Sequence, residues 1–195
     1  MKVVNQLLPS LDGKALMMGR PAYTDDFAAP GSLIVKVLRS PHAFARIVEI
    51  DVEEARKLPG VELVLTYKDC KRIPFTRAGQ GYPEPSPHDK FVLDEYVRYI
   101  GDEVAIVAAV DLVTAEKALA LIQVQFAVLK PILDFETAAG NQTILHPEPE
   151  IHEMFPIGFD PKRNIAAAYK MNVGDVDSVL VRCDVVVERT YRTTA

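Results

Sequence analysis

The amino-acid sequence predicts an α+β fold in which a mixed β-sheet carries two short helices on one side. The first observation is a strand-helix-strand pattern that occurs twice, over residues 45–66 and again over 104–128. The second is the shortness of the first helix, which leaves few residues for the crossover that a doubly wound parallel sheet requires. These features favour helices gathered on one face of the sheet.

The first pattern is preceded by one additional strand. Residues 32–38 and 45–50 are short, β-branched runs of partly alternating polarity, which are typical of strands. Asp51 is a good N-cap and Glu54 follows three residues later, as in a capping box, so a short helix is predicted here. A further β-branched run over 61–66 predicts the strand that follows the helix.

The second pattern contains a more strongly apolar strand. Residues 104–110 form a continuous apolar run, as expected of a buried strand. Asp111 or Thr114 then caps a predicted helix, and the run over 124–128 predicts the next strand. The apolar residues of this helix recur at helical spacing and are Ala115, Ala118, Leu119 and Ile122.

Two stretches rich in glycine and proline interrupt the pattern. Residues 77–90 predict a long surface loop, because proline at alternate positions prevents both a helix and a central strand. Residues 140–161 are again loop-like, so we predict two domains, 1–140 and 141–195. The run 184–192 predicts a strand without a partner, which indicates a truncated second domain.

Composition argues against several classes of protein. The chain has 22 basic and 27 acidic residues and no basic run that could follow a phosphate backbone, so nucleic acid is not an expected partner. Its start lacks the features of a secretory signal, and no segment reaches the roughly 18 continuous apolar residues of a membrane span. We therefore expect a cytoplasmic protein. Cys70 and Cys183 have no metal-type spacing, which predicts plain thiols.

Residues that could form a reactive site each have a simpler structural interpretation. His146 and His152 lie in an acidic loop whose prolines prevent the helix that would align metal ligands, so a solvated loop is favoured over a metal site. Asp25 with Asp26, and residues 174–177, are favoured as turns or caps over carboxylate pairs. No nucleophile elbow, Walker loop or dinucleotide-binding glycine motif occurs. We therefore assign no catalytic, cofactor-binding or metal-binding residue.

Four motifs occur in an informative order, at residues 19–26, 38–47, 55–61 and 97–105. Together they resemble the successive signatures of the α/β hammerhead domain in the large subunit of molybdenum hydroxylases, the xanthine dehydrogenase and aldehyde oxidase family. Phe44 departs from that family, which often has histidine there. The tail over 184–193 resembles the first strand of the molybdopterin-binding region that follows the hammerhead domain.

A narrower resemblance involves three further segments, at residues 79–87, 155–158 and 163–167. These segments are similar to the branch of selenium-dependent xanthine dehydrogenases and purine hydroxylases. The second predicted domain is accordingly interpreted as a linker and the first part of a truncated molybdenum-cofactor-binding domain.

The resemblance implies the chemistry of a larger enzyme. Such enzymes hydroxylate purines, other N-heterocycles or aldehydes with oxygen from water, and use molybdopterin cytosine dinucleotide, [2Fe-2S] clusters and FAD. The implied partners are the remaining molybdenum-binding domains and the iron-sulfur and FAD subunits or domains. No residue of this chain matches the family's pterin-binding loops or its glutamate base. A structural, domain-interface role is therefore expected, with no activity in the isolated chain; a free-standing binding or assembly module is the alternative.

Overall fold

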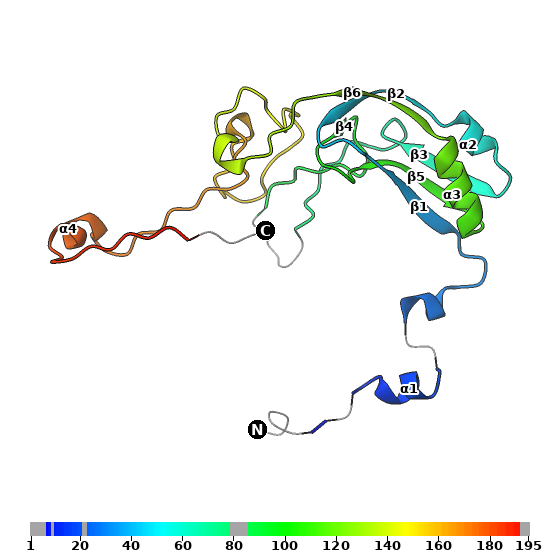
Figure 1. The fold of residues 1–195 in the computed structure, drawn as a ribbon, viewed down its shortest axis with the longest axis horizontal. Coiled ribbons are helices and arrows are strands. Elements are labelled where there is room, and N and C mark those ends of the chain that lie inside the picture. Colours follow the sequence, from blue (N-terminus) through cyan, green and yellow to red (C-terminus); the bar gives the residue numbers. More distant parts are fainter. Residues whose placement is uncertain (1–6, 9, 21–22, 79–85, 192–195) are drawn as a thin grey trace. The chain divides into compact units, whose positions relative to one another are not determined.

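The computed structural model describes residues 7–8, 10–20, 23–78 and 86–191 (Figure 1). Most of the regular structure lies between residues 34 and 128. In chain order, the elements are α1 (Gly13–Met17), a 3-10 helix (Thr24–Phe27), β1 (Ile34–Arg39), β2 (Ala45–Asp51), α2 (Glu53–Lys57), β3 (Val61–Thr66), β4 (Tyr96–Val97), β5 (Glu103–Ala109), α3 (Leu112–Leu121), β6 (Gln123–Val128), two 3-10 helices (Phe135–Thr137 and Pro161–Arg163) and α4 (Val176–Val181).

The strands of the described residues form two three-stranded sheets. The first sheet has the order β1-β5-β3, the second has the order β4-β2-β6, and their pairings are antiparallel. The predicted α+β class is confirmed, whereas the single mixed sheet is resolved into two antiparallel ones. The reason is that α2 connects β2 of the second sheet to β3 of the first, and α3 connects β5 of the first sheet to β6 of the second. Each helix therefore joins two sheets and forms no parallel crossover within one.

The hydrophobic core lies between these helices and the inner faces of the sheets. Figure 1 shows α2 and α3 side by side next to the strands of the first sheet. Ala115 and Ala118 of α3 are fully buried, which confirms the predicted apolar side of this helix. The buried cluster comprises Ala45, Ile47, Ile50, Val52, Ala55, Val64, Val97, Val104, Ala105, Val107, Ala118 and Ile122.

The N-terminus of α3 is capped as predicted, but that of α2 is not. Asp111 accepts the Thr114 N–H at 2.7 Å. In α2 the N-cap position is Val52, so Glu54 is one residue too early in the helix to complete a capping box. Its carboxylate instead bonds Lys57 at 2.8 Å, while Asp51 accepts the N–H of Glu53.

The helices in the described ranges are short. The longest, α3, has ten residues, about half the length that a bilayer span requires. None of them has the length and apolar character needed to cross a membrane.

The chain divides into two compact units. The first unit comprises residues 1–72 and 92–131 and contains both sheets, and the second comprises 73–91 and 132–195. The second unit consists mainly of irregular chain with short helical turns. An isolated antiparallel bridge between His88 and His152 joins its two segments.

The strand predicted at 184–192 is not formed in the described part, residues 184–191. These residues follow α4 in extended, exposed chain, and Val185 and Val187 are more than 70% exposed. The physical reason is that an isolated run cannot satisfy its backbone N–H and C=O groups as a strand without a neighbouring edge. Arg192 lies outside the described residues.

Candidate functional site

The first sheet has an inner face packed against the helices and an outer face dominated by apolar side chains. The outer face of the first sheet consists of Val35, Val37, Leu63, Leu65, Ile106 and Ala108. The strand register places Val35, Ala108 and Leu63 in one row and the other three in the next. Directly opposed residues of antiparallel strands point to the same side, so the two rows form a continuous apolar surface. Val35 is 58% and Leu63 46% exposed.

The outer face of the second sheet is polar by comparison. It carries Arg46, Glu49, Tyr96, Gln123 and Gln125 together with Ala127, and Val48 at the irregularity in β2 is also exposed. Arg46 Nε lies 2.6 Å from Glu95 Oε1, and Gln125 Nε2 donates to Glu49 Oε2 at 2.9 Å across the sheet. Antiparallel sheets commonly turn polar residues toward water on one face, and the second sheet follows this pattern. The outer face of the first sheet has instead the composition of a surface that another body covers.

Two of the sequence motifs meet at one end of the first sheet. The Ser40 N–H donates to the Asp102 carbonyl at 2.8 Å, and the Gly101 N–H donates to the Ser40 carbonyl at 2.8 Å. Gly101 has a φ of 92°, a conformation that is strained for residues with a Cβ. Phe44, where the family often has histidine, is buried in the first unit at 6% exposure. These motif residues therefore have scaffold roles.

Asp94 is a buried charge held between two arginines. Its carboxylate accepts hydrogen bonds from Arg72 at 2.8 Å and from Arg98 at 2.6 Å, and it also accepts the Glu95 N–H at 2.8 Å. Burial raises the pKa of Asp94, but the hydrogen bonds and positive charges of Arg98 and Arg72 outweigh burial and leave that pKa lowered. This network connects the residues on either side of β4 with Arg72, which follows β3 in the chain. It was not predicted, because separated charges in a loop give no periodic signal.

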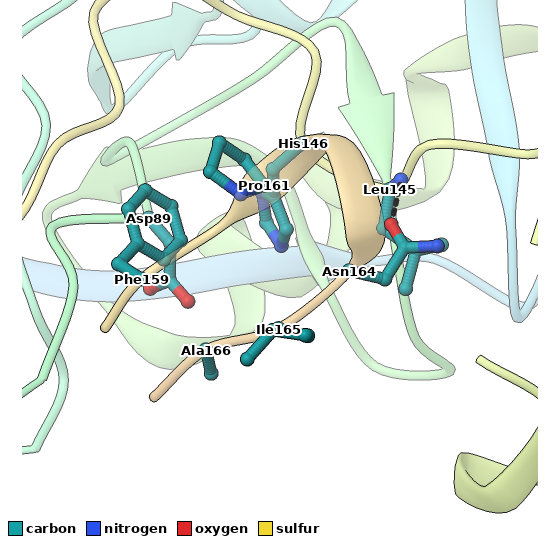
Figure 2. Close-up of a pocket in the computed structure, with 8 residues that line it drawn as sticks. All are labelled: Asp89, Leu145, His146, Phe159, Pro161, Asn164, Ile165 and Ala166. Carbon is teal, nitrogen blue, oxygen red and sulfur yellow. Dashed lines mark hydrogen bonds between the residues drawn. The ribbon is translucent and has the colours of Figure 1, made fainter. Parts of the chain in front are cut away.

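The second unit contains a small pocket of about 170 Å³ (Figure 2). Its lining is mostly apolar and comprises Asp89, Leu145, His146, Phe159, Pro161, Asn164, Ile165 and Ala166. None of these described lining residues carries a hydroxyl, thiol or amine. The titratable side chains among the described lining residues are those of Asp89 and His146.

Asn164 at the pocket wall ties three backbone segments together. Its Oδ1 accepts the Leu145 N–H at 2.9 Å, the bond drawn in Figure 2, and its Nδ2 donates to the carbonyls of Ala138 and Thr143. Asn164 is also the non-glycine residue with positive φ, 56°, among the described residues. Asparagine tolerates this left-handed conformation better than most residues. Its amide is thus fully used in structure, a role that the sequence did not reveal.

Replacing Asn164 with alanine is expected to lower the free energy of unfolding of the second unit by about 2 kcal/mol, because three hydrogen bonds are lost and the left-handed backbone becomes strained. Asn164→Gly is the matched control, since it loses the same bonds but relieves the strain and should cost less. Amide hydrogen exchange at Leu145 measures both. Equal protection in the wild type and both variants would contradict the role assigned to this amide.

The aspartates considered in the sequence have capping roles where they are described. Asp26 accepts the Tyr23 N–H at 3.0 Å. Asp175 accepts the Ser178 N–H at 3.2 Å at the start of α4, which lowers the pKa of Asp175. These two observations support turns and caps over a carboxylate pair. The side chain of Asp25 lies outside the described part of the structure.

The two histidines that are close in sequence occupy different settings. His146 lines the pocket, whereas the ring of His152 lies beside that of His88 with centroids 5.1 Å apart. Across the described ranges, no group of three or more His, Cys, Asp or Glu residues could hold a metal ion. Cys70 and Cys183 are both free thiols, as predicted, and burial raises the pKa of Cys70.

Comparison with known proteins decides the family. A family model described as "Aldehyde oxidase and xanthine dehydrogenase, a/b hammerhead domain" matches residues 18–130, more than half of the chain. The chain belongs to this family. The match spans both sheets and the helices α2 and α3, so the predicted hammerhead fold is confirmed.

Relatives of this chain include an oxidase and a molybdenum-binding subunit. "Probable hypoxanthine oxidase XdhD" of Escherichia coli O157:H7 is 35% identical, and the match covers all of this chain and 23% of the relative. "Xanthine dehydrogenase molybdenum-binding subunit" of the same strain is 33% identical over 94% of this chain and 23% of its own length. The chain thus spans about a quarter of these relatives and is a fragment of the large molybdenum subunit.

Solved structures of the family have the same fold over this region. The aldehyde oxidoreductase of Desulfovibrio gigas matches with a TM-score of 0.58 and 28% identity, covering 71% of this chain and 16% of its own. The CO dehydrogenase of Oligotropha carboxidovorans matches with a TM-score of 0.58 and 33% identity, covering 69% of this chain and 16% of its own.

Proposed function

We propose that this chain is the N-terminal part of the molybdenum-binding subunit of a xanthine dehydrogenase or aldehyde oxidoreductase-type hydroxylase, in which it acts as a domain-interface scaffold. The observation that carries the proposal is the contrast between the two outer sheet faces. One carries mainly polar side chains, and the other carries six apolar side chains, of which Val35 and Leu63 are exposed. In a fragment that spans about a quarter of its relatives, the remaining subunit is the natural body to cover the apolar face.

The energetics favour this use of the outer face of the first sheet. Complete burial of a valine or leucine side chain contributes about 1.5–3 kcal/mol. Val35 and Leu63 are about half exposed, so covering them recovers a substantial part of that amount. The hydrogen bonds of Ser40 with Asp102 and Gly101 tie the end of β1 to the turn before β5, and both strands present this face. The first unit is therefore a rigid support with an incomplete surface.

We propose that this chain holds none of the cofactors of the enzyme. A [2Fe-2S] cluster held by cysteines takes four thiolates, and the chain has two cysteines. The described residues likewise offer no cluster of three metal ligands for other metals. We propose that molybdopterin cytosine dinucleotide is bound by the remaining molybdenum-binding domains, and that [2Fe-2S] clusters and FAD belong to other domains or subunits. The predicted cytoplasmic location is part of the same proposal.

Residues 141–195 are proposed to be a linker and the beginning of the molybdenum-cofactor-binding domain, with 1–140 as the hammerhead domain. The exposed run at 184–191 supports this interpretation, since it has the composition of a strand and lacks an edge to pair with. For the substrate we propose a purine or related N-heterocycle. The 35% identical relative is named "Probable hypoxanthine oxidase XdhD", which supports a purine. The sequence resemblance to the purine hydroxylase branch supports the same substrate.

The isolated chain is expected to be inactive. After expression in a host that makes molybdopterin cytosine dinucleotide, the purified chain should retain no molybdenum above background and should not oxidise xanthine, hypoxanthine or an aldehyde with a dye acceptor. A full-length relative prepared in the same host is the positive control. Stoichiometric cofactor or measurable turnover in the isolated chain would overturn the scaffold assignment.

The alternative, a free-standing binding or assembly module, predicts a different result. Such a module would be inactive as well, so activity does not separate the two. Coexpression with the remaining part of the large subunit does, because a scaffold fragment should join that part in a stoichiometric complex. A chain that stays separate from it would favour the alternative.

A further inference from the structure

We propose that His88 and His152 form a binding site for one borderline divalent transition-metal ion, such as Cu²⁺, Ni²⁺ or Zn²⁺. Both residues belong to the second unit and face each other across an isolated antiparallel bridge. The His88 N–H donates to the His152 carbonyl at 2.8 Å. The Cβ atoms of directly opposed residues in such a pair lie about 4.5–5.5 Å apart. The two imidazoles are therefore brought together by the backbone itself.

The separation of the two rings suits a shared ion. Their centroids are 5.1 Å apart and their planes are tilted by 45°. Zinc-to-imidazole bonds are about 2.0–2.1 Å long, which puts the ion roughly 3 Å from each ring centre and the two ring centres roughly 4.5–5.5 Å apart. The observed spacing of the ring centres lies within this range.

One ring is already held in the tautomer that a metal needs. His152 Nδ1 lies 2.8 Å from the backbone carbonyl oxygen of Glu150. A carbonyl oxygen only accepts, so Nδ1 must carry the proton and the neutral ring leaves Nε2 with its lone pair. A hydrogen bond from the second ring nitrogen to a carbonyl is the usual arrangement of a metal-bound histidine.

The pair is accessible, and its chemistry sets the class of ion. His152 is exposed and His88 half-buried, so an ion can enter from solvent. Because the described residues offer no third metal ligand beside the pair, water would complete the coordination shell. Neutral imidazole suits copper, nickel and zinc, and their affinity for such a site is highest for Cu²⁺. Calcium and magnesium prefer oxygen ligands and should not compete.

A bound ion would connect the two segments of the second unit, 73–91 and 132–195. An ion that binds only the folded arrangement stabilises it by mass action, so metal should slow local opening of the bridge. This site is independent of the proposed hydroxylase function, because it uses neither the outer face of the first sheet nor any cofactor.

Cu²⁺ titration of the purified chain tests the site. Isothermal titration calorimetry is expected to give one ion per chain, with paramagnetic broadening of the His88 and His152 ring signals in NMR spectra. His152→Gln and His88→Gln should each weaken binding at least about tenfold, because a single imidazole remains.

His42→Gln is the matched control, since His42 lies in the first unit against the ring of Phe126. It should leave the affinity unchanged. Persistence of the Asp160–Ile165 bridge in hydrogen exchange establishes that the His88 and His152 variants are folded. Unchanged affinity in both His88→Gln and His152→Gln, or equal broadening at His42 and His146, would overturn the proposal and indicate adventitious binding.

Discussion

Arg98→Ala is expected to lower the free energy of unfolding of the first unit by about 3 kcal/mol, the lower end of the cost of breaking a buried ion pair. Asp94 is 3% exposed and Arg98 12%, so removal of the arginine leaves a buried carboxylate with one of its two charged partners. Arg72 remains at 2.8 Å and limits the loss. Urea denaturation together with hydrogen exchange of the β5 amides measures the change.

The same network predicts how stability depends on pH. The pKa of Asp94 is lowered in the folded chain, because its bonds to Arg98 and Arg72 outweigh burial. The ionised carboxylate therefore contributes stability above its unfolded pKa of about 3.9, and this contribution is lost as pH falls through the folded-state pKa. In Arg98→Ala the folded-state pKa of Asp94 rises toward its unfolded value or above it, so Asp94 contributes less to acid destabilisation, and stability should fall less steeply with decreasing pH than in the wild type.

Arg46→Ala is the control for this experiment. Arg46 also pairs with a carboxylate, that of Glu95 at 2.6 Å, but its side chain is 53% exposed. Exposed ion pairs are screened by water and contribute little. We expect a marked loss of stability for Arg98→Ala and almost none for Arg46→Ala. If the two variants unfolded at the same urea concentration, the buried network would not be a determinant of stability.

The sequence predicts local structure well where one short segment determines it. The apolar run at 104–110 corresponds to β5, and Asp111 caps α3 as its position suggests. The division into two sheets was not predictable, because strand partners depend on contacts distant in sequence. Asp94 and Asn164 were missed for a related reason. Their partners lie 4 to 26 residues away, and a polar residue in a loop has the same sequence pattern whether it is solvated or buried.

The outer face of the first sheet could likewise be predicted only in part from the sequence. Alternation within 34–38 and 61–65 is consistent with strands, but the strands could have been buried on both faces or on one. Only the register, which sets Val35 beside Ala108 and Leu63, shows that these three residues share the face opposite the helices, where Val35 and Leu63 are exposed. Family resemblance predicted an interface role without indicating which surface performs it.

The double variant Val35→Lys/Leu63→Lys is expected to weaken association with the remainder of the large subunit by about a hundredfold or more. Because Val35 and Leu63 are already about half buried, each loses about half of the roughly 1.5–3 kcal/mol of full burial, and two positive charges would also have to be desolvated. Each 1.4 kcal/mol corresponds to a factor of ten in the dissociation constant. The affinity is measured by analytical ultracentrifugation with the separately expressed remainder.

Gln123→Lys/Gln125→Lys is the matched control, because it adds the same charge to the outer face of the second sheet. Gln125 bonds Glu49, and a lysine there can still pair with that carboxylate. This variant should bind the remainder like the wild type. In the isolated chain, the wild type and the control should bind a hydrophobic dye, whereas Val35→Lys/Leu63→Lys should bind less. Both double variants add the same charge, but only Val35→Lys/Leu63→Lys removes apolar side chains. Equal weakening by the two would therefore contradict the proposal, because added charge alone would explain the lost affinity.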